Sequence, residues 1–243
     1  MLITNYWWPY NVDSTFRWLE FAQYIDFDVI TSKKPKRGFY DETIPRRGGN
    51  IFSYWSGRSG ILWSLAIIRV VISKRKDYEI FIFASPPEGL IITAWLLQFF
   101  GKKVLLDQRD SFGRETQGVK WLTPVYKWFY RRLKNVVVCM KFIDPTKPVV
   151  RHGYIPVKKC KKYTIVPERV GYKQYYDDLE KGILHYRDNT LKGNYSAQVP
   201  TLKYIGLRKE LLRREFHHEV WMFKEDTWEN EAEKMKRVLN AVK

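Results

Sequence analysis

Two aspartates stand where a parallel α/β fold commonly places its chemistry. Asp13 follows the first apolar run and precedes an amphipathic segment, and Asp110 follows the apolar run Lys103–Asp107. Because parallel strands end at the same edge of a sheet, the loops after them share one ligand-facing side. A carboxylate on that side can accept the proton of an attacking hydroxyl group. We predict Asp13 and Asp110 as catalytic carboxylates, with an ion pair to Arg109 or Arg114 as the structural alternative for Asp110.

Aromatic and basic side chains also follow the early strands. Aromatic faces can stack on sugars or nucleic-acid bases, and guanidinium groups can hold phosphates. We expect these residues at the rim of a ligand cleft, where they would contact an acceptor substrate. The predicted acceptor-binding residues are Trp7, Trp8, Tyr10, Arg17, Trp55 and Arg58.

No pattern in the sequence predicts a required metal ion. Asp26-Phe-Asp28 has the Asp-x-Asp spacing of some metal sites, but the motif is short and stands at the start of a predicted strand, so we interpret it as turn and strand residues. Cys139 and Cys160 lack metal-ligand spacing and cannot form a disulfide framework, which is typical of a reduced compartment.

Net charge and apolar runs narrow the range of partners and compartments. The chain has 243 residues and a net charge of +17, and the basic residues are spread over both halves. Such a charge attracts nucleic acid, an anionic membrane face or phosphorylated small molecules. We find no signal-peptide pattern and no apolar run long enough to span a bilayer. The expected location is cytoplasmic, with peripheral membrane association as an option.

The first half of the sequence alternates between predicted strands and helices. Such alternation predicts an α/β fold with a parallel sheet covered on both faces. Ser85-Pro-Pro-Glu88 predicts a helix capped by Ser85. The predicted strands are 2–6, 27–31, 79–84, 103–107 and 135–139, and the predicted helices are 14–24, 60–74, 88–100 and 124–133.

Two prolines in Asp144–Pro148 suggest a domain boundary. We therefore divide the chain into residues 1–147 and residues 148–243. In the second part we predict strands at 163–166 and 182–186 and helices at 174–181, 201–208 and 229–242.

Several segments resemble glycosyltransferase family 4, whose members have the GT-B fold. Phe16-Arg-Trp-Leu-Glu-Phe-Ala-Gln-Tyr-Ile25 is similar to the first helix of that family. Ser85-Pro-Pro and Leu106-Asp-Gln-Arg-Asp110 also resemble family segments. In the second half, Arg169-Val-Gly-Tyr172 and Val199-Pro-Thr-Leu-Lys-Tyr-Ile-Gly-Leu-Arg-Lys209 resemble segments that bind the nucleotide-sugar.

The resemblance implies two Rossmann-like domains facing a cleft, the second reduced in size and holding the donor. It implies a nucleotide-sugar co-substrate, with a UDP-sugar favoured, and no other cofactor. The implied donor-binding residues are Arg169, Val170, Tyr172, Arg187, Asn189, Lys192, Lys203 and Tyr204. The chain departs from the family pattern at Val12-Asp13-Ser14, where paired glycines are usual, and at Lys203, which stands where a ribose-binding Glu is usual.

The resemblance and the charge together predict a sugar transferase, and three acceptor readings stay open. A 5-hydroxymethylated pyrimidine base in DNA, as in phage enzymes that modify their own genomes, is favoured by the small size and positive charge. A surface polysaccharide or lipid-linked glycan, reached at an anionic membrane, is the alternative. A degenerate, non-catalytic nucleic-acid-binding relative is the third. A homodimer could complete a site that one short donor domain leaves open.

Overall fold

The computed structural model describes most of the first 150 residues and short segments beyond them. The described residues are 1–5, 7–8, 10–11, 13–33, 39–40, 42–54, 60–85, 87–109, 112, 120–139, 143–150, 163–166, 173, 177, 183–185, 217–218 and 228–242. No helix within these ranges is both long and apolar enough to cross a bilayer.

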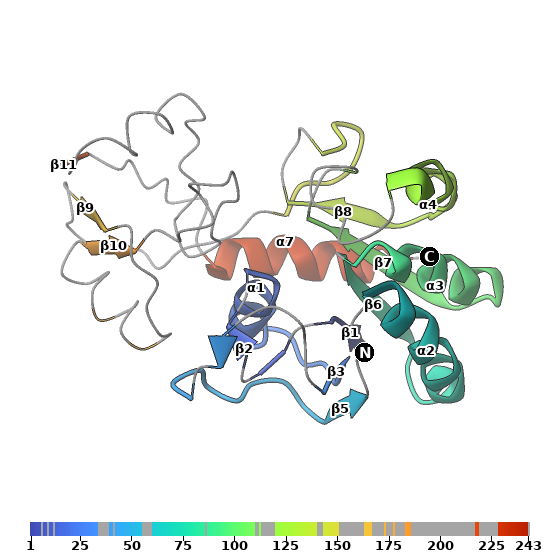
Figure 1. The fold of residues 1–243 in the computed structure, drawn as a ribbon, viewed down its shortest axis with the longest axis horizontal. Coiled ribbons are helices and arrows are strands. Elements are labelled where there is room, and N and C mark those ends of the chain that lie inside the picture. The colour runs from blue at the N-terminus through green and yellow to red at the C-terminus, as the bar shows by residue number, and fades with distance from the viewer. Residues whose placement is uncertain are drawn as a thin grey trace.

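A six-stranded parallel sheet forms the centre of the fold (Figure 1). Its strands are β1 (Leu2–Ile3), β3 (Val29–Ser32), β5 (Ile51–Tyr54), β6 (Ile80–Ser85), β7 (Lys103–Gln108) and β8 (Val136–Val138). They lie in the order β5-β3-β1-β6-β7-β8. The chain builds outward from β1 to β5, returns to the other side of β1, and builds outward again to β8. This is the doubly wound order of Rossmann-like folds, and it confirms the predicted α/β class.

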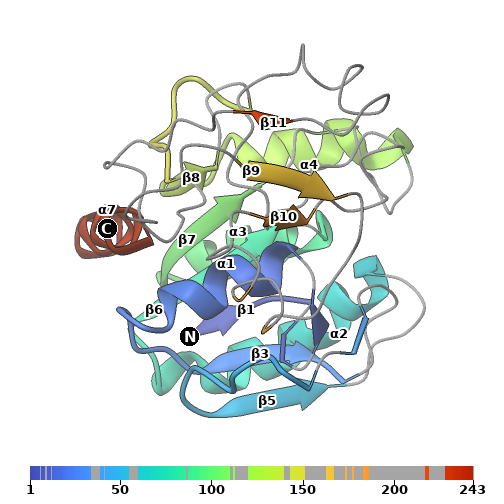
Figure 2. The same ribbon diagram turned by 90° about the vertical axis from the view of Figure 1, so that its left-hand side faces the viewer.

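Helices cover both faces of the sheet, as Figure 2 shows with α1 in front and α3 behind. One face packs against α1 (Asp13–Phe21) and α7 (Trp228–Asn240), and the other packs against α2 (Gly60–Ser73), α3 (Gly89–Phe99) and α4 (Thr123–Tyr130). Successive strand residues serve opposite faces, so that Leu2 joins the first core and Ile3 the second. Because both faces are buried, the strands are apolar throughout rather than alternating.

The terminal helix α7 belongs to the core of the sheet domain. Trp228, Ala232 and Met235 lie one face apart along the helix and are all buried. The Trp228 ring meets the edge of Phe21 in α1 at a centroid distance of 5.8 Å. Part of the segment predicted as the second domain therefore completes the core of the first.

Two small sheets accompany the large one. β2 (Tyr10–Asn11) pairs antiparallel with β4 (Phe39–Tyr40). β9 (Tyr163–Val166) lies between β10 (Ile183–His185), to which it is parallel, and β11 (His217–His218), to which it is antiparallel. The strands predicted at 163–166 and 182–186 are thus present. The predicted helix 201–208 and most of the predicted helix 174–181 lie outside the described residues.

The predicted start of the helix after β6 is wrong. Ser85 ends β6, and α3 begins at Gly89 with Glu88 as its N-cap residue. Pro87 disfavours a helical backbone at the residue before it, which moves the first helical turn later in the chain. Ser85 is therefore not the capping residue.

Candidate functional site

The strand order defines one place where a ligand is expected. β1 and β6 are neighbours, but the chain leaves β1 toward β3 and leaves β6 toward β7. The two connections separate above the carboxyl ends of these strands, and open α/β sheets bind their ligands in the crevice formed there. Asn5 follows β1, and Ser85 is the last residue of β6.

Buried polar side chains without a hydrogen-bond partner gather at this edge. The Asn5 Oδ1, Ser85 Oγ, Thr31 Oγ1 and Ser32 Oγ atoms have no partner among the described residues. Their residues are 5%, 0%, 2% and 4% exposed, respectively. Each such group costs about 1–3 kcal/mol when it is left unpaired. Four of them at the carboxyl edge of two strands indicate a site that a polar ligand would complete.

A buried ion pair lies near the carboxyl end of β7. Arg17 Nη2 donates to Asp107 Oδ1 at 3.3 Å, and both side chains are fully buried. Trp18 Nε1 donates to the other carboxylate oxygen at 3.0 Å. The Arg17 guanidinium also stacks over the Phe21 ring, 5.0 Å from its centroid. These contacts fix the orientation of Arg17.

The remaining donors of Arg17 are available to a ligand. Its Nε and Nη1 atoms have no acceptor among the described residues, and the same is true of Arg109 Nε at the end of β7. Guanidinium groups pair strongly with carboxylates and phosphates. The carboxyl edge of the sheet therefore combines hydroxyl and amide groups with two permanent positive charges.

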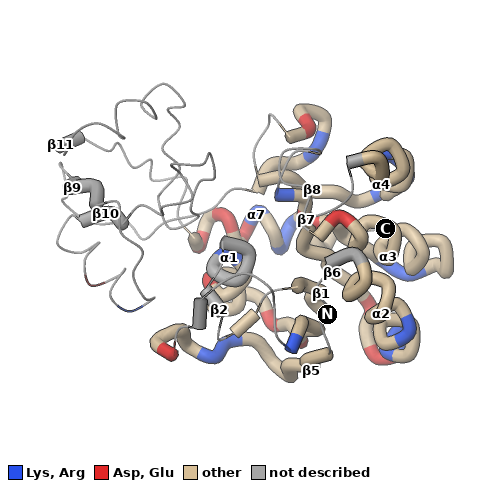
Figure 3. The backbone as a smooth tube through the Cα atoms, in the orientation of Figure 1, with Lys and Arg blue, Asp and Glu red and all other residues tan. Residues whose placement is uncertain are grey.

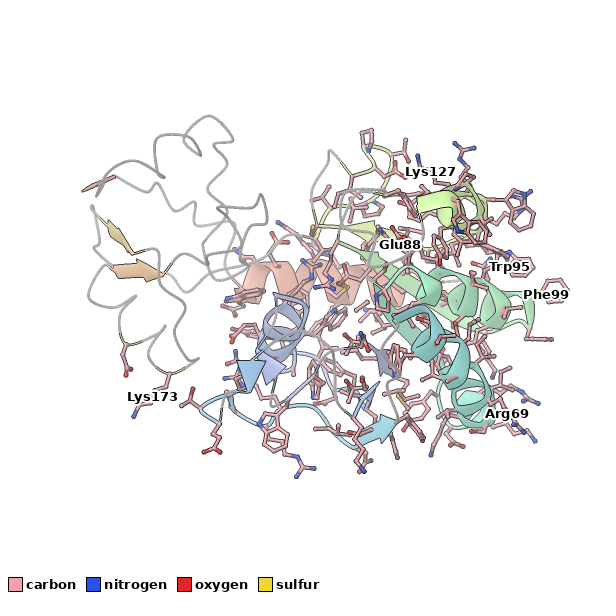
Figure 4. The ribbon with its side chains drawn as sticks, viewed as in Figure 1. Arg69, Glu88, Trp95, Phe99, Lys127 and Lys173 are labelled. Carbon is pink, nitrogen blue, oxygen red and sulfur yellow. The ribbon has the colours of Figure 1, made fainter. Side chains whose placement is uncertain are left out.

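The start of α3 adds a further polar element to this edge. The helix has 11 residues, and its N-cap residue, Glu88 (Figure 4), makes no side-chain cap hydrogen bond. The first N–H groups of a helix carry a partial positive charge that favours anions. Burial, and then the charge of Glu88, raise the pKa of the Tyr126 hydroxyl in α4 above its usual value. Tyr126 Oη is buried and has no hydrogen-bond partner within the described part of the chain.

The structure places the predicted acceptor-binding residues in different surroundings. Trp7 is 1% exposed and packs edge-on against Phe27 at 5.9 Å, so that it lies in the core rather than on an exposed rim. Trp8 is half-buried and donates from Nε1 to the Ile44 carbonyl oxygen at 2.9 Å. Tyr10 lies in β2 beside β4. Arg17 occupies the buried pair described above.

Most of the predicted catalytic and donor-binding residues cannot be located in space. Asp13 is the first residue of α1, which puts its backbone at the helix N-terminus. The predicted residues outside the described part are Trp55, Arg58, Asp110, Arg169, Val170, Tyr172, Arg187, Asn189, Lys192, Lys203 and Tyr204.

Sequence reasoning missed the polar residues that the sheet brings together. Asn5, Thr31 and Ser32 were not singled out, and Ser85 was interpreted only as a helix cap. Their shared signal is a polar residue directly at the end of an apolar strand, which is where Asn5 and Ser85 stand in the sequence.

Asp28 of the Asp-x-Asp pattern serves as an acceptor for neighbouring elements. It accepts hydrogen bonds from Tyr78 Oη, from the Asn50 backbone N–H at 2.6 Å and from Asn50 Nδ2 at 3.3 Å. Burial acts to raise the pKa of Asp28, but these hydrogen bonds outweigh it and hold the pKa below its usual value. No cluster of His, Cys, Asp or Glu within the described ranges has the makings of a metal site.

Comparisons of the chain with known protein families, with curated proteins and with solved structures find no match. The function must therefore be inferred from the site and from the sequence segments that surround it.

Proposed function

We propose that the protein is a nucleotide-sugar-dependent glycosyltransferase whose Rossmann-like sheet domain forms one side of the active site. The observation that carries the proposal is the set of buried, unpartnered polar groups at the carboxyl edge of β1, β3 and β6 beside Arg17 and Arg109. A ligand rich in hydroxyl groups and carrying phosphate would satisfy both kinds of group. The segments that resemble glycosyltransferase family 4 support the same class of ligand.

The transfer that we propose needs a base and a positive environment for the leaving group. The acceptor hydroxyl oxygen bonds to the anomeric carbon of the donor sugar, and the bond from that carbon to the nucleotide diphosphate breaks. The hydroxyl proton passes to a carboxylate, for which Asp13 and Asp110 are the candidates. The negative charge that develops on the diphosphate is stabilised by guanidinium groups and by the N–H groups at the start of a helix.

In this proposal a shortened second domain, which includes β9 and β10, holds the nucleotide. The favoured donor is a UDP-sugar. The net charge of +17 supports a DNA acceptor carrying a 5-hydroxymethylated pyrimidine. One observation favours the second candidate, an enzyme of surface polysaccharide or lipid-linked glycan synthesis: an exposed aromatic face bordered by basic residues on α3 and α4. A homodimer that completes the donor site remains part of the proposal.

A thermal-shift screen tests the proposal directly. UDP, GDP, TDP and CMP and their sugars are added with and without duplex DNA containing hydroxymethylcytosine. We expect one nucleotide class to raise the melting temperature, and the modified duplex to increase the shift if DNA is the acceptor. Stabilisation by DNA alone, with no hydrolysis of any donor, would support the non-catalytic reading instead.

Ser85→Ala links the nucleotide response to the site. Because the Ser85 hydroxyl is buried and unpaired, its removal should leave the stability of the free protein unchanged or raise it. Loss of a hydrogen bond to the ligand should weaken binding by about tenfold. Ser53→Ala, at an exposed serine of β5, is the matched control and should bind like the wild type. Equal binding by the Ser85→Ala variant and the wild type would remove this edge of the sheet from the active site.

A further inference from the structure

Five aromatic residues form an exposed face on α3, α4 and the turns beside them. Phe99 is 70% exposed, Phe100 58%, Trp128 46% and Trp121 73%, and Trp95 is half-buried among them. Isolated exposed apolar residues are ordinary on soluble proteins, but contiguous ones mark sites of interaction. We call these residues, Trp95, Phe99, Phe100, Trp121 and Trp128, the α3–α4 aromatic face.

Four of these rings contact one another. Trp95 stacks on Phe99 with centroids 5.5 Å apart and meets Trp128 of α4 at 6.1 Å. Phe99 in turn meets Phe100 at 5.7 Å. Gln98 fastens the two helices behind the rings, since its Nε2 donates to the Arg132 carbonyl oxygen at 2.9 Å and its Oε1 accepts the Lys134 N–H at 2.7 Å. The face is therefore organised before any partner arrives.

Basic residues surround the face, and acidic ones are absent from its segments. Residues 89–106 and 120–139 contain no Asp or Glu. The Arg132 guanidinium lies 3.5 Å from the centroid of the Trp128 ring, and Lys103 alone is paired, with Glu79 from the preceding strand. The basic residues of the two segments are Lys102, Lys103, Lys120, Lys127, Arg131, Arg132 and Lys134. Figure 3 shows the basic positions along α4.

The surface continues onto the neighbouring helix α2. Leu62 and Leu65 are 57% and 45% exposed, and Arg69 follows them on the same side of the helix. Figure 4 shows Trp95, Phe99, Lys127 and Arg69 along one side of the molecule. A surface pocket of about 490 Å³ lies on α4 between the basic and aromatic side chains, lined by Thr123, Pro124, Lys127, Trp128, Arg131 and Arg132.

Cations in the last turn of a helix stabilise its dipole, which accounts for part of the charge but not for the exposed rings. A second copy of the chain would bring the same basic residues against each other, which charge disfavours. Protruding phenyl rings offer DNA no hydrogen bonds, whereas a lipid leaflet accepts them into its acyl boundary. Trp side chains and Lys or Arg suit the headgroup level above.

We infer that the α3–α4 aromatic face docks the protein on an anionic lipid leaflet. Phe99 and Phe100 enter the acyl boundary, Trp128 lies at the headgroups, and Lys127, Arg131 and Arg132 contact lipid phosphates. The inference concerns a surface outside the candidate active site and does not depend on the proposed transferase activity.

Vesicle co-sedimentation of the full chain, without any nucleotide, tests the inference. Wild type is expected to bind vesicles of equal parts phosphatidylcholine and phosphatidylglycerol, to bind phosphatidylcholine vesicles weakly, and to dissociate as salt is raised. Phe99→Ser/Phe100→Ser should weaken partitioning by about tenfold or more. Lys127→Gln/Arg131→Gln should weaken it by about 25-fold, since each cation near the surface contributes about 1 kcal/mol.

The control is Lys33→Gln/Arg237→Gln, which removes the same charge from exposed residues away from this face. It should bind vesicles within about twofold of the wild type, because distant charges are screened. Circular dichroism confirms that each variant is folded. Equal losses in the control and in Lys127→Gln/Arg131→Gln would overturn the inference, because the binding would then follow net charge alone.

Two other outcomes would also overturn it. One is binding of duplex DNA that the face variants abolish, with no vesicle binding by the wild type. The other is a wild-type dimer in sedimentation velocity that Phe99→Ser/Phe100→Ser converts to a monomer. Neither outcome would bear on nucleotide binding at the sheet edge, which the thermal-shift screen measures separately.

Discussion

Replacing Asp107 by asparagine should reveal how strongly charge holds Arg17 in the core. The two side chains are fully buried, and their ion pair measures 3.3 Å. Asparagine has nearly the same volume and can still accept the hydrogen bond from Trp18 Nε1, so the substitution removes mainly the negative charge. The buried guanidinium would then lack its partner. We expect Asp107→Asn to lower the free energy of unfolding by about 3–5 kcal/mol.

Removal of both charges should restore much of that loss. In Asp107→Asn/Arg17→Met no charge remains to be desolvated, and methionine can occupy the space beside Phe21. We expect the double variant to be about 2 kcal/mol more stable than Asp107→Asn. Asp77→Asn serves as the control, because Asp77 pairs with Lys74 at an exposed site and should contribute at most about 0.5 kcal/mol.

Urea unfolding at pH 7, followed by far-UV circular dichroism, measures all four proteins. A loss below about 1 kcal/mol in Asp107→Asn, or a double variant no more stable than that single one, would refute the reasoning. The same proteins also test the candidate site. An uncompensated Arg17 should attract anions, so pyrophosphate should raise the melting temperature of Asp107→Asn more than that of the wild type.

Three further substitutions test other parts of the fold. Asp28→Asn should cost about 1–2 kcal/mol at pH 7; because the folded pKa of Asp28 is depressed, the difference from wild type should persist above the unfolded pKa and shrink as pH falls below about 4. A pH-independent difference in urea unfolding would contradict the role of the Asp28 charge. Trp228→Ala should cost about 3–5 kcal/mol if α7 belongs to the sheet core, whereas a change under about 1 kcal/mol would detach the helix from it. Gly49→Ala should cost about 1–3 kcal/mol, because its Cβ would collide with the Asp28 carboxylate; Gly101→Ala, which meets no neighbouring atom but has a positive φ, should cost about 1–2 kcal/mol for backbone strain alone.

Local patterns predicted most of the sheet domain. Buried parallel strands are continuous apolar runs, and β6 and β7 are found within one residue of their predicted bounds. β5 was not predicted because its four residues, Ile51–Tyr54, lie at the sheet edge and are only partly buried. The start of α3 was predicted too early because the capping pattern at Ser85 competes with the proline that follows it.

Contacts between distant segments left no local signal in the sequence. Arg17 and Asp107 are separated by 90 residues, and nothing near either one predicts the pair. The buried polar groups of Asn5 and Ser85 become neighbours of one ligand site only through the strand order. Periodicity predicted α7 as a helix, but the partner of its apolar face depends on tertiary packing that periodicity does not encode.

The position of α7 has a consequence for how the protein is synthesised. The core that Phe21 and Trp18 help to form is closed by Trp228, which the ribosome adds only near the end of the chain. Contacts of such long sequence separation form slowly, since a large loop must close first. Until then the outer side of α1 lacks its cover, and a chain cut after residue 147 would keep that apolar surface exposed. A compact version of the sheet domain should instead join residue 150 to residue 226 through a short flexible linker, so that helix and sheet are made together.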